Sequence, residues 1–293
     1  MASHEHYYVP AQSKWPIIAS IGLLVTVFGL GTWFNDLTAG HKESHGPWIF
    51  FVGGLIIAYM LFGWFGNVIR ESRAGLYSAQ MDRSFRWGMS WFIFSEVMFF
   101  ACFFGALFYA RALSIPWLGG EGNNASTNEV LWNGFVAAWP TNGPGEVGGD
   151  FGTIPAFGIP FLNTLILLFS GVTITLAHHA LKAEKRKQLV GWLAATVILG
   201  AIFLYYQAYE YAHAYNDLGL TLGSGIYGST FFMLTGFHGL HVTLGAIMLF
   251  VIMIRCMRGH FKPDSHFGFE AVAWYWHFVD VVWLGLFIFV YVL

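Results

Sequence analysis

The chain has 293 residues, of which 56% are hydrophobic and only 10% are charged, and its formal net charge is −2. A soluble domain carries roughly 25% charged residues, so the composition excludes that class and is typical of a protein that crosses a membrane several times. The slight negative charge provides no basic surface, which excludes nucleic acid as a partner. Cys102 and Cys256 lie in separate apolar segments, a pattern that indicates neither a disulfide framework nor a thiolate metal site.

Hydrophobic segments predict the fold. The polar N-terminus lacks the short basic and apolar pattern of a cleavable signal, so the first apolar stretch is predicted to be a retained span. Crossing about 30 Å of hydrocarbon takes about 20 apolar residues in a helix. The segments that meet this length are Trp15–Phe34, Trp48–Gly66, Gly88–Ala110, Ile159–His179, Val190–Ala212, Tyr227–Ile254 and Ala271–Leu293. The sequence therefore predicts an all-α membrane protein with seven transmembrane helices.

Positive charges predict the orientation. With the N-terminus in the cytoplasm, every Lys and Arg except Lys42 and Arg111 falls on the cytoplasmic side, as the positive-inside rule requires. The C-terminus is then periplasmic, and the segment 113–158, between spans three and four, lies on the outer face. That segment carries four acidic residues and neither Lys nor Arg. We interpret it as a solvated loop, with attraction of a cationic partner as the alternative.

Two polar groups stand out in the middle spans. Glu96 is predicted to lie roughly 12 Å inside the hydrocarbon, either as a proton-active or lipid-facing carboxylate or as a carboxyl satisfied by another helix. His238 and His241 are three residues apart on one face, so they could ligate a metal, with His277 as a third ligand, or one could reach Glu96. No fourth ligand is evident, so we expect hydrogen-bonding histidines and no metal site.

Further polar residues lie at the span ends and in the last span. His178 and His179 point about 100° apart, which makes a shared metal difficult and an interfacial or lipid-headgroup role plausible. In the last span, Glu270 and His277 share a face, and Asp280 lies near mid-membrane with a partner that the sequence does not identify. Haem held between helices needs paired histidines on two facing spans, and the few mid-membrane histidines predict no such site.

Five strings resemble subunit III of the haem-copper cytochrome c oxidases, in the family's order and on the family's helices. They are RWGMSWFIFSEVMFF (86–100), FLNTLILLFSGVTITLAHHAL (161–181), QAYEY (207–211), GSTFFMLTGFHGLHVTLG (228–245) and FEAVAWYWHFVDVVWL (269–284). Together they cover most of spans three to seven. The opening segment, with YYVP and KWP, is also similar to the family's.

The resemblance implies an arrangement and a role. A two-helix N-terminal bundle (1–70) and a five-helix bundle (71–293) are expected, separated by a cleft that holds phospholipids. Glu96 matches the family's intramembrane carboxylate and His241 the histidine that meets it near a bound lipid, and Trp91 joins these lipid-binding candidates. The subunit is expected to hold no redox centre and no catalytic residue, and to support turnover and proton uptake by the complex.

The partners follow from the same resemblance. Subunits I and II are expected to carry haem a, haem a3 and copper, and cytochrome c is the electron donor of the complex, which reduces dioxygen to water and pumps protons. The segment 113–158 is longer than in mitochondrial relatives, which indicates a bacterial inner membrane. Two alternatives remain open. Quinol oxidase subunit III looks shorter, without the first helix pair, and a stand-alone proton or ion transporter would often show internal repeats, which we do not detect.

Overall fold

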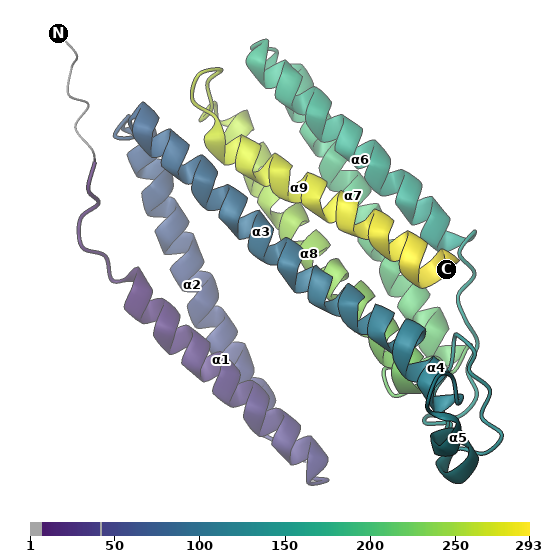
Figure 1. Ribbon diagram of the computed structural model, residues 1–293. Helices are drawn as coiled ribbons and strands as arrows, with labels where there is room; N and C mark the ends of the chain where they lie inside the picture. Colours follow the sequence, from purple (N-terminus) through teal and green to yellow (C-terminus); the bar gives the residue numbers. More distant parts are fainter. Residues whose placement is uncertain (1–7, 42) are drawn as a thin grey trace. The chain divides into compact units, whose positions relative to one another are not determined.

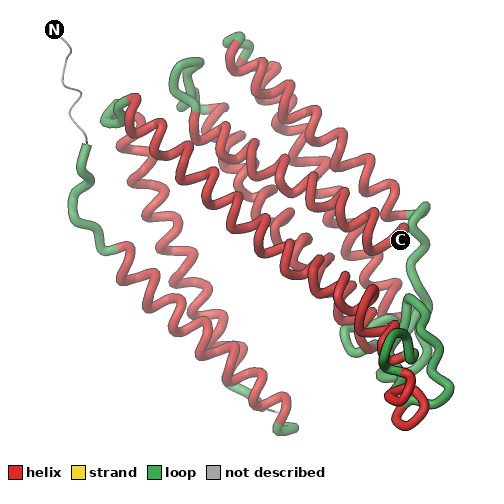
Figure 2. The backbone as a smooth tube through the Cα atoms, viewed as in Figure 1, coloured by secondary structure: helices red, strands yellow, loops and turns green. Residues whose placement is uncertain are grey.

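A computed structural model describes residues 8–41 and 43–293, and Lys42, one of the two exceptions in the charge pattern, lies outside the described residues. Over these ranges the chain is built of helices and connecting loops, without a β-strand (Figure 2). The described residues contain seven helices that are long and apolar enough to cross a membrane, which confirms the seven predicted spans. Contacts divide the chain into two compact units, Met1–Phe85 and Arg86–Leu293.

The first unit is dominated by the helical pair α1 (Trp15–Thr38) and α2 (Gly46–Arg73). A proline stands in the first turn of each helix, where the backbone N–H has no intrahelical partner to lose. Gly29 of α1 is buried, and a Cβ there would collide with the backbone of α2 at Ile49 and Phe50. Such small residues let two membrane helices approach closely, and this approach holds the pair together.

The second unit is built around α6 (Ile159–Lys182), α7 (Arg186–Asn216), α8 (Gly225–Met257) and α9 (Phe267–Leu286), the last continued by the π-helical turn η2 (Phe287–Val292). Each of the four helices packs against the next, and α9 returns to α6, so they form a closed bundle (Figure 1). This packing brings the C-terminal end of α6 next to the start of α9.

Two tryptophans of α9 occupy the centre of this bundle. Trp276 and Trp283 are both fully buried. The indole N–H of Trp276 donates to Ser170 Oγ at 2.8 Å and that of Trp283 donates to Thr164 Oγ1 at 2.9 Å, so both indoles are hydrogen-bonded to α6. A buried indole N–H needs such a partner, and these bonds fix how α9 is rotated against α6.

The third span extends beyond its apolar segment. The helix α3 (Ala79–Tyr109) continues through the π-helical turn η1 (Ala110–Ser114) into α4 (Ile115–Leu118). The helical path ends where Gly119 and Gly120 follow, Gly120 having a φ of +92° that suits glycine. The segment 113–158 therefore begins as helix, contains the short helix α5 (Ala125–Leu131), and is irregular from there to α6.

Candidate functional site

Glu96 on α3 and His241 on α8 form an ion pair, with 2.8 Å between Glu96 Oε2 and His241 Nε2. The other ring nitrogen, Nδ1, lies 2.6 Å from the backbone oxygen of Phe237 and donates to it. An oxygen therefore stands at each ring nitrogen of His241, Glu96 Oε2 at Nε2 and the Phe237 carbonyl at Nδ1. The carboxylate and the imidazole thus partner each other between α3 and α8.

The surroundings of this pair are apolar and aromatic. The His241 ring lies 4.9 Å from the ring of Phe100 and 6.4 Å from that of Tyr275, measured between centroids. The side chain of His241 is 10% exposed and that of Glu96 is 22% exposed, so the carboxylate is the member closer to the outside of the unit. A carboxylate in such apolar surroundings is normally paired, as Glu96 is here.

Trp91 does not join this pair. It lies five residues before Glu96 on α3, which turns it roughly 140° around the helix. Its ring is largely exposed and packs edge-on against Phe94 at 5.6 Å. Trp91 belongs to the exposed apolar surface of α3, on a different side from the carboxylate.

His238 is a packing residue. It is fully buried, its Nε2 donates to the backbone oxygen of Val279 at 3.1 Å, and its ring lies 5.1 Å from that of Trp283. In the described part of the chain, the conceivable metal set of His238, His241 and His277 is not brought together. The expectation that these histidines make hydrogen bonds is confirmed for His238 and His241.

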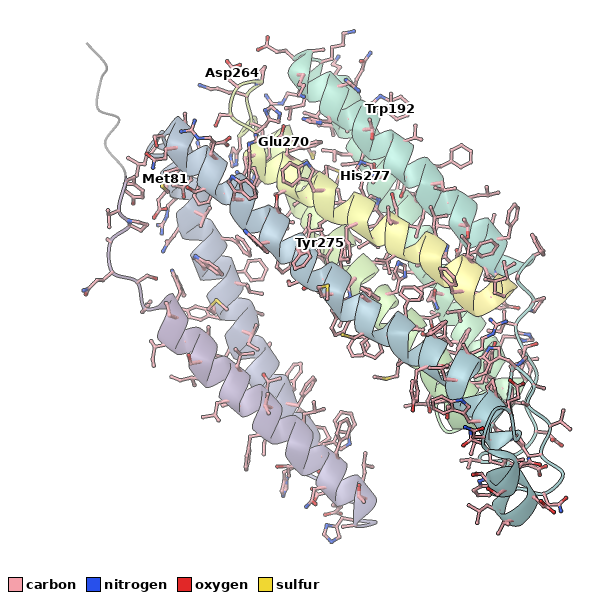
Figure 3. The ribbon with its side chains drawn as sticks, in the orientation of Figure 1. Met81, Trp192, Asp264, Glu270, Tyr275 and His277 are labelled. Carbon is pink, nitrogen blue, oxygen red and sulfur yellow. The ribbon has the colours of Figure 1, made fainter. Side chains whose placement is uncertain are left out.

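The partner of Asp280, which the sequence did not identify, is His277 one turn earlier on α9. Asp280 is buried, and its Oδ2 lies 3.8 Å from His277 Nδ1, while His277 Nε2 lies 3.4 Å from Thr175 Oγ1 on α6. His179 lines the same shallow pocket between α6 and α9. Figure 3 shows His277 further along α9 than Glu270, and the two residues make separate sets of contacts.

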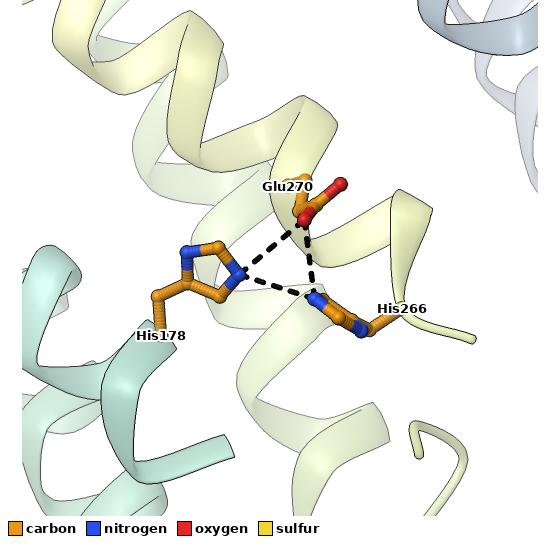
Figure 4. Close-up of side chains that lie close together, drawn as sticks. All are labelled: His178, His266 and Glu270. Atoms are coloured by element: carbon orange, nitrogen blue, oxygen red, sulfur yellow. Dashed lines mark hydrogen bonds and ion pairs between the residues drawn. The ribbon is translucent and has the colours of Figure 1, made fainter. Parts of the chain in front are cut away.

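Glu270 belongs to a cluster at the junction of α6 and α9 (Figure 4). Its Oε1 lies 3.1 Å from His266 Nε2 and 3.5 Å from His178 Nε2, and the two ring nitrogens are 3.1 Å apart. Its Oε2 forms an ion pair with Arg86 of α3. His178 and His179 thus face different sites, as their 100° separation predicts.

Sequence reasoning missed His266 because it lies in the loop before the last apolar segment. The signal was present in the chain, since His266 and Glu270 are four residues apart at the start of a helix and therefore share a face. Among the residues described, the cluster of His178, His266 and Glu270 is also the one group whose atoms are close enough together to hold a metal ion.

Comparison with known proteins supports the resemblance found in the sequence. The chain matches the family model of cytochrome c oxidase subunit III over residues 4–124 and 130–293. Cytochrome c oxidase subunit 3 of Drosophila melanogaster is 40% identical over 294 residues, which cover 99% of this chain and 98% of that protein. The same subunit of Danio rerio is 39% identical over 293 residues, covering 99% and 98%, and that of Gadus morhua is 38% identical over 286 residues, covering 97% and 96%. The interruption in the family match, 125–129, falls within α5, between spans three and four.

Proposed function

Because this chain belongs to the cytochrome c oxidase subunit III family, we propose that it is a non-redox accessory subunit that packs against the catalytic subunit I of a proton-pumping oxidase. In this proposal, haem a, haem a3 and copper are carried by subunits I and II, and cytochrome c delivers the electrons. The chain contributes no catalytic residue; it stabilises subunit I and supports its proton uptake.

The observation that carries this proposal is the Glu96–His241 pair. A carboxylate in an apolar setting normally has a partner, and Glu96 has His241 as its partner while its own side chain stays 22% exposed. Phe92, one turn before Glu96 on the same face of α3, is exposed and apolar, and the remaining surface of the helix also carries exposed apolar side chains such as Trp91 and Met98, which suits acyl chains. We infer that phospholipid lies against this face, and that the Glu96–His241 pair contributes to proton supply.

The proposed setting is the inner membrane of a bacterium, with the N-terminus in the cytoplasm and the C-terminus in the periplasm. Support for the orientation comes from the Lys and Arg residues, all but two of which gather on one side of the predicted spans. The basic turn between α6 and α7, with Lys182, Lys185, Arg186 and Lys187, then lies at the cytoplasmic surface.

A substitution tests the lipid role directly. Glu96→Ala in the assembled oxidase removes the partly buried partner of His241, so we expect assembly to continue while tightly bound phospholipid and endurance during turnover decrease. Phospholipid is counted by mass spectrometry after purification, and endurance is the number of turnovers before activity halves. Ser95→Ala is the matched control, because the Ser95 hydroxyl donates only within its own helix, to Phe92 O at 2.6 Å. Equal lipid content and endurance in both variants would refute the lipid role.

A second experiment tests the assignment to an oxidase. The tagged chain, purified in mild detergent, should bring down a haem-bearing partner whose activity uses cytochrome c. Activity with quinol alone would favour the quinol oxidase relative. Proton flux through the isolated chain in liposomes, abolished by Glu96→Gln, would favour a transporter instead.

A further inference from the structure

We propose that His178, His266 and Glu270 form a binding site for a divalent transition metal, with zinc as the best match, where the end of α6 meets the start of α9. The inference is independent of the proposed oxidase role, and it departs from the expectation, based on sequence alone, that the chain holds no metal. Three observations support it: the distances between the three ligand atoms, the orientation of the His266 lone pair, and the ion pair between Arg86 and Glu270 that holds the carboxylate in place.

The spacing fits tetrahedral coordination. Ligand atoms about 2.0–2.1 Å from a tetrahedral zinc ion lie about 3.3 Å from one another. Here Nε2 of His178, Nε2 of His266 and Oε1 of Glu270 are separated by 3.1, 3.1 and 3.5 Å (Figure 4). The three atoms therefore stand close to the separations of one face of a zinc tetrahedron, and the fourth position is left for water.

The lone pairs also point to a cation. His266 Nδ1 lies 3.1 Å from the backbone oxygen of Lys262 and donates to it, which leaves Nε2 unprotonated in the neutral ring. That lone pair faces Glu270 Oε1 at 3.1 Å, so two acceptors confront each other unless a proton or a metal ion lies between them. Histidines that bind metals are commonly held in this way, by a backbone carbonyl at the second nitrogen.

Arg86 supports the carboxylate. It pairs with Oε2 of Glu270, so Oε1 remains directed at the two histidines. Two imidazoles and one carboxylate are a ligand set that suits zinc. The side chains of His266 and Glu270 are 8% and 11% exposed and that of His178 is 26% exposed, so an ion reaches the site past His178. Because Arg86 is itself positively charged, it repels a metal ion in the site and weakens its binding. The bound metal can therefore exchange.

Zinc binding to the assembled complex tests the site. After treatment with a chelator, the wild-type complex is titrated with Zn²⁺ in equilibrium dialysis, and bound zinc is measured by mass spectrometry. Loss of a residue that only supports a metal ligand commonly weakens metal binding about 10–100-fold. His266→Ala and Glu270→Gln each remove a ligand itself, so each should weaken the affinity for one equivalent of Zn²⁺ about 100-fold. His179→Ala is the matched control, since it removes an adjacent, exposed histidine that faces away from the cluster. Unchanged zinc binding in His266→Ala, or an equal loss in His179→Ala, would overturn the proposal.

A measurement on the wild-type complex needs no variant to fold. Diethyl pyrocarbonate modifies accessible imidazoles, and peptide mass spectrometry resolves His178 from His179. One equivalent of Zn²⁺ should slow modification of His178 about tenfold and leave His179 unchanged, because only His178 would lose its free nitrogen. Equal rates at His178 with and without zinc, or equal protection of both histidines, would contradict the site.

Discussion

Alanine at Gly245 should destabilise the bundle of α6 to α9, whereas alanine at Gly239, six residues earlier on α8, should not. A Cβ at Gly245 would lie 2.9 Å from Cε3 and 3.0 Å from Cζ3 of Trp276, well inside the contact distance of about 3.5–4.0 Å between carbon atoms. Trp276 has no room to move, because it is fully buried, donates to Ser170, and lies against Gly200 of α7, where a Cβ would be 2.8 Å from its Cη2. A Cβ at Gly239 would have no atom within 4 Å.

Two opposing terms give the magnitude. Overpacking a core costs about 1–3 kcal/mol, and replacing glycine by alanine inside a helix favours folding by about 1 kcal/mol. Gly245→Ala should therefore lower the free energy of unfolding by about 0–2 kcal/mol, while Gly239→Ala should raise it by about 1 kcal/mol. Unfolding by sodium dodecyl sulfate in mixed micelles, followed by far-ultraviolet circular dichroism, measures both. Equal transition midpoints for the two variants would show that Trp276 does not pack as tightly as described.

Three further outcomes follow from contacts of Trp276, Arg86 and Tyr77. Trp276→Phe should lower the free energy of unfolding by about 2–4 kcal/mol, because it leaves a cavity and removes the N–H donor to Ser170 Oγ, whose hydroxyl still donates to Leu167 O, as the same detergent titration will show. Arg86→Gln should cost about 1–3 kcal/mol, since Glu270 is mostly buried, and Arg86→Lys should recover part of the loss; no loss in Arg86→Gln would contradict the ion pair. Burial, with a hydrogen bond to Glu71, raises the pKa of Tyr77 above its usual value of 10.0. The protonated hydroxyl therefore stabilises the fold fully below pH 10.0, and this stabilisation is lost as the pH rises further. Ultraviolet titration of the wild type against Tyr77→Phe will detect the raised pKa.

Hydrophobicity makes the number of spans predictable, but it does not define where the helices end. Apolar residues mark Gly88–Ala110 as the third span, whereas the helical path runs from Ala79 to Leu118. The additional turns contain Arg83 and Arg86, which are too polar to count as hydrocarbon-spanning yet form the same backbone hydrogen bonds. Helices continue past the apolar boundary because their backbone bonding does not depend on hydrophobic side chains.

The candidate site could also be predicted only in part, because hydropathy does not report which residues of different helices meet. Glu96 and His241 could be paired from sequence because both lie near the middle of their spans, at depths that match. The spacing of His266 and Glu270 was readable in the sequence, but their contact with His178 was not, since His266 and His178 are 88 positions apart in the chain. Hydropathy carries no information on such a contact, which depends on how α6 packs against α9.

The uneven burial of the spans bears on what becomes of this chain when partners are scarce. In α9, 50% of the most apolar window is buried within the chain itself, against 11% in each of the first three spans. The four-helix bundle therefore covers more of its apolar surface within the chain, while α1 to α3 keep broad apolar faces for other subunits or lipid to cover. In a copy without partners, we expect these N-terminal spans to be the part of the chain left uncovered.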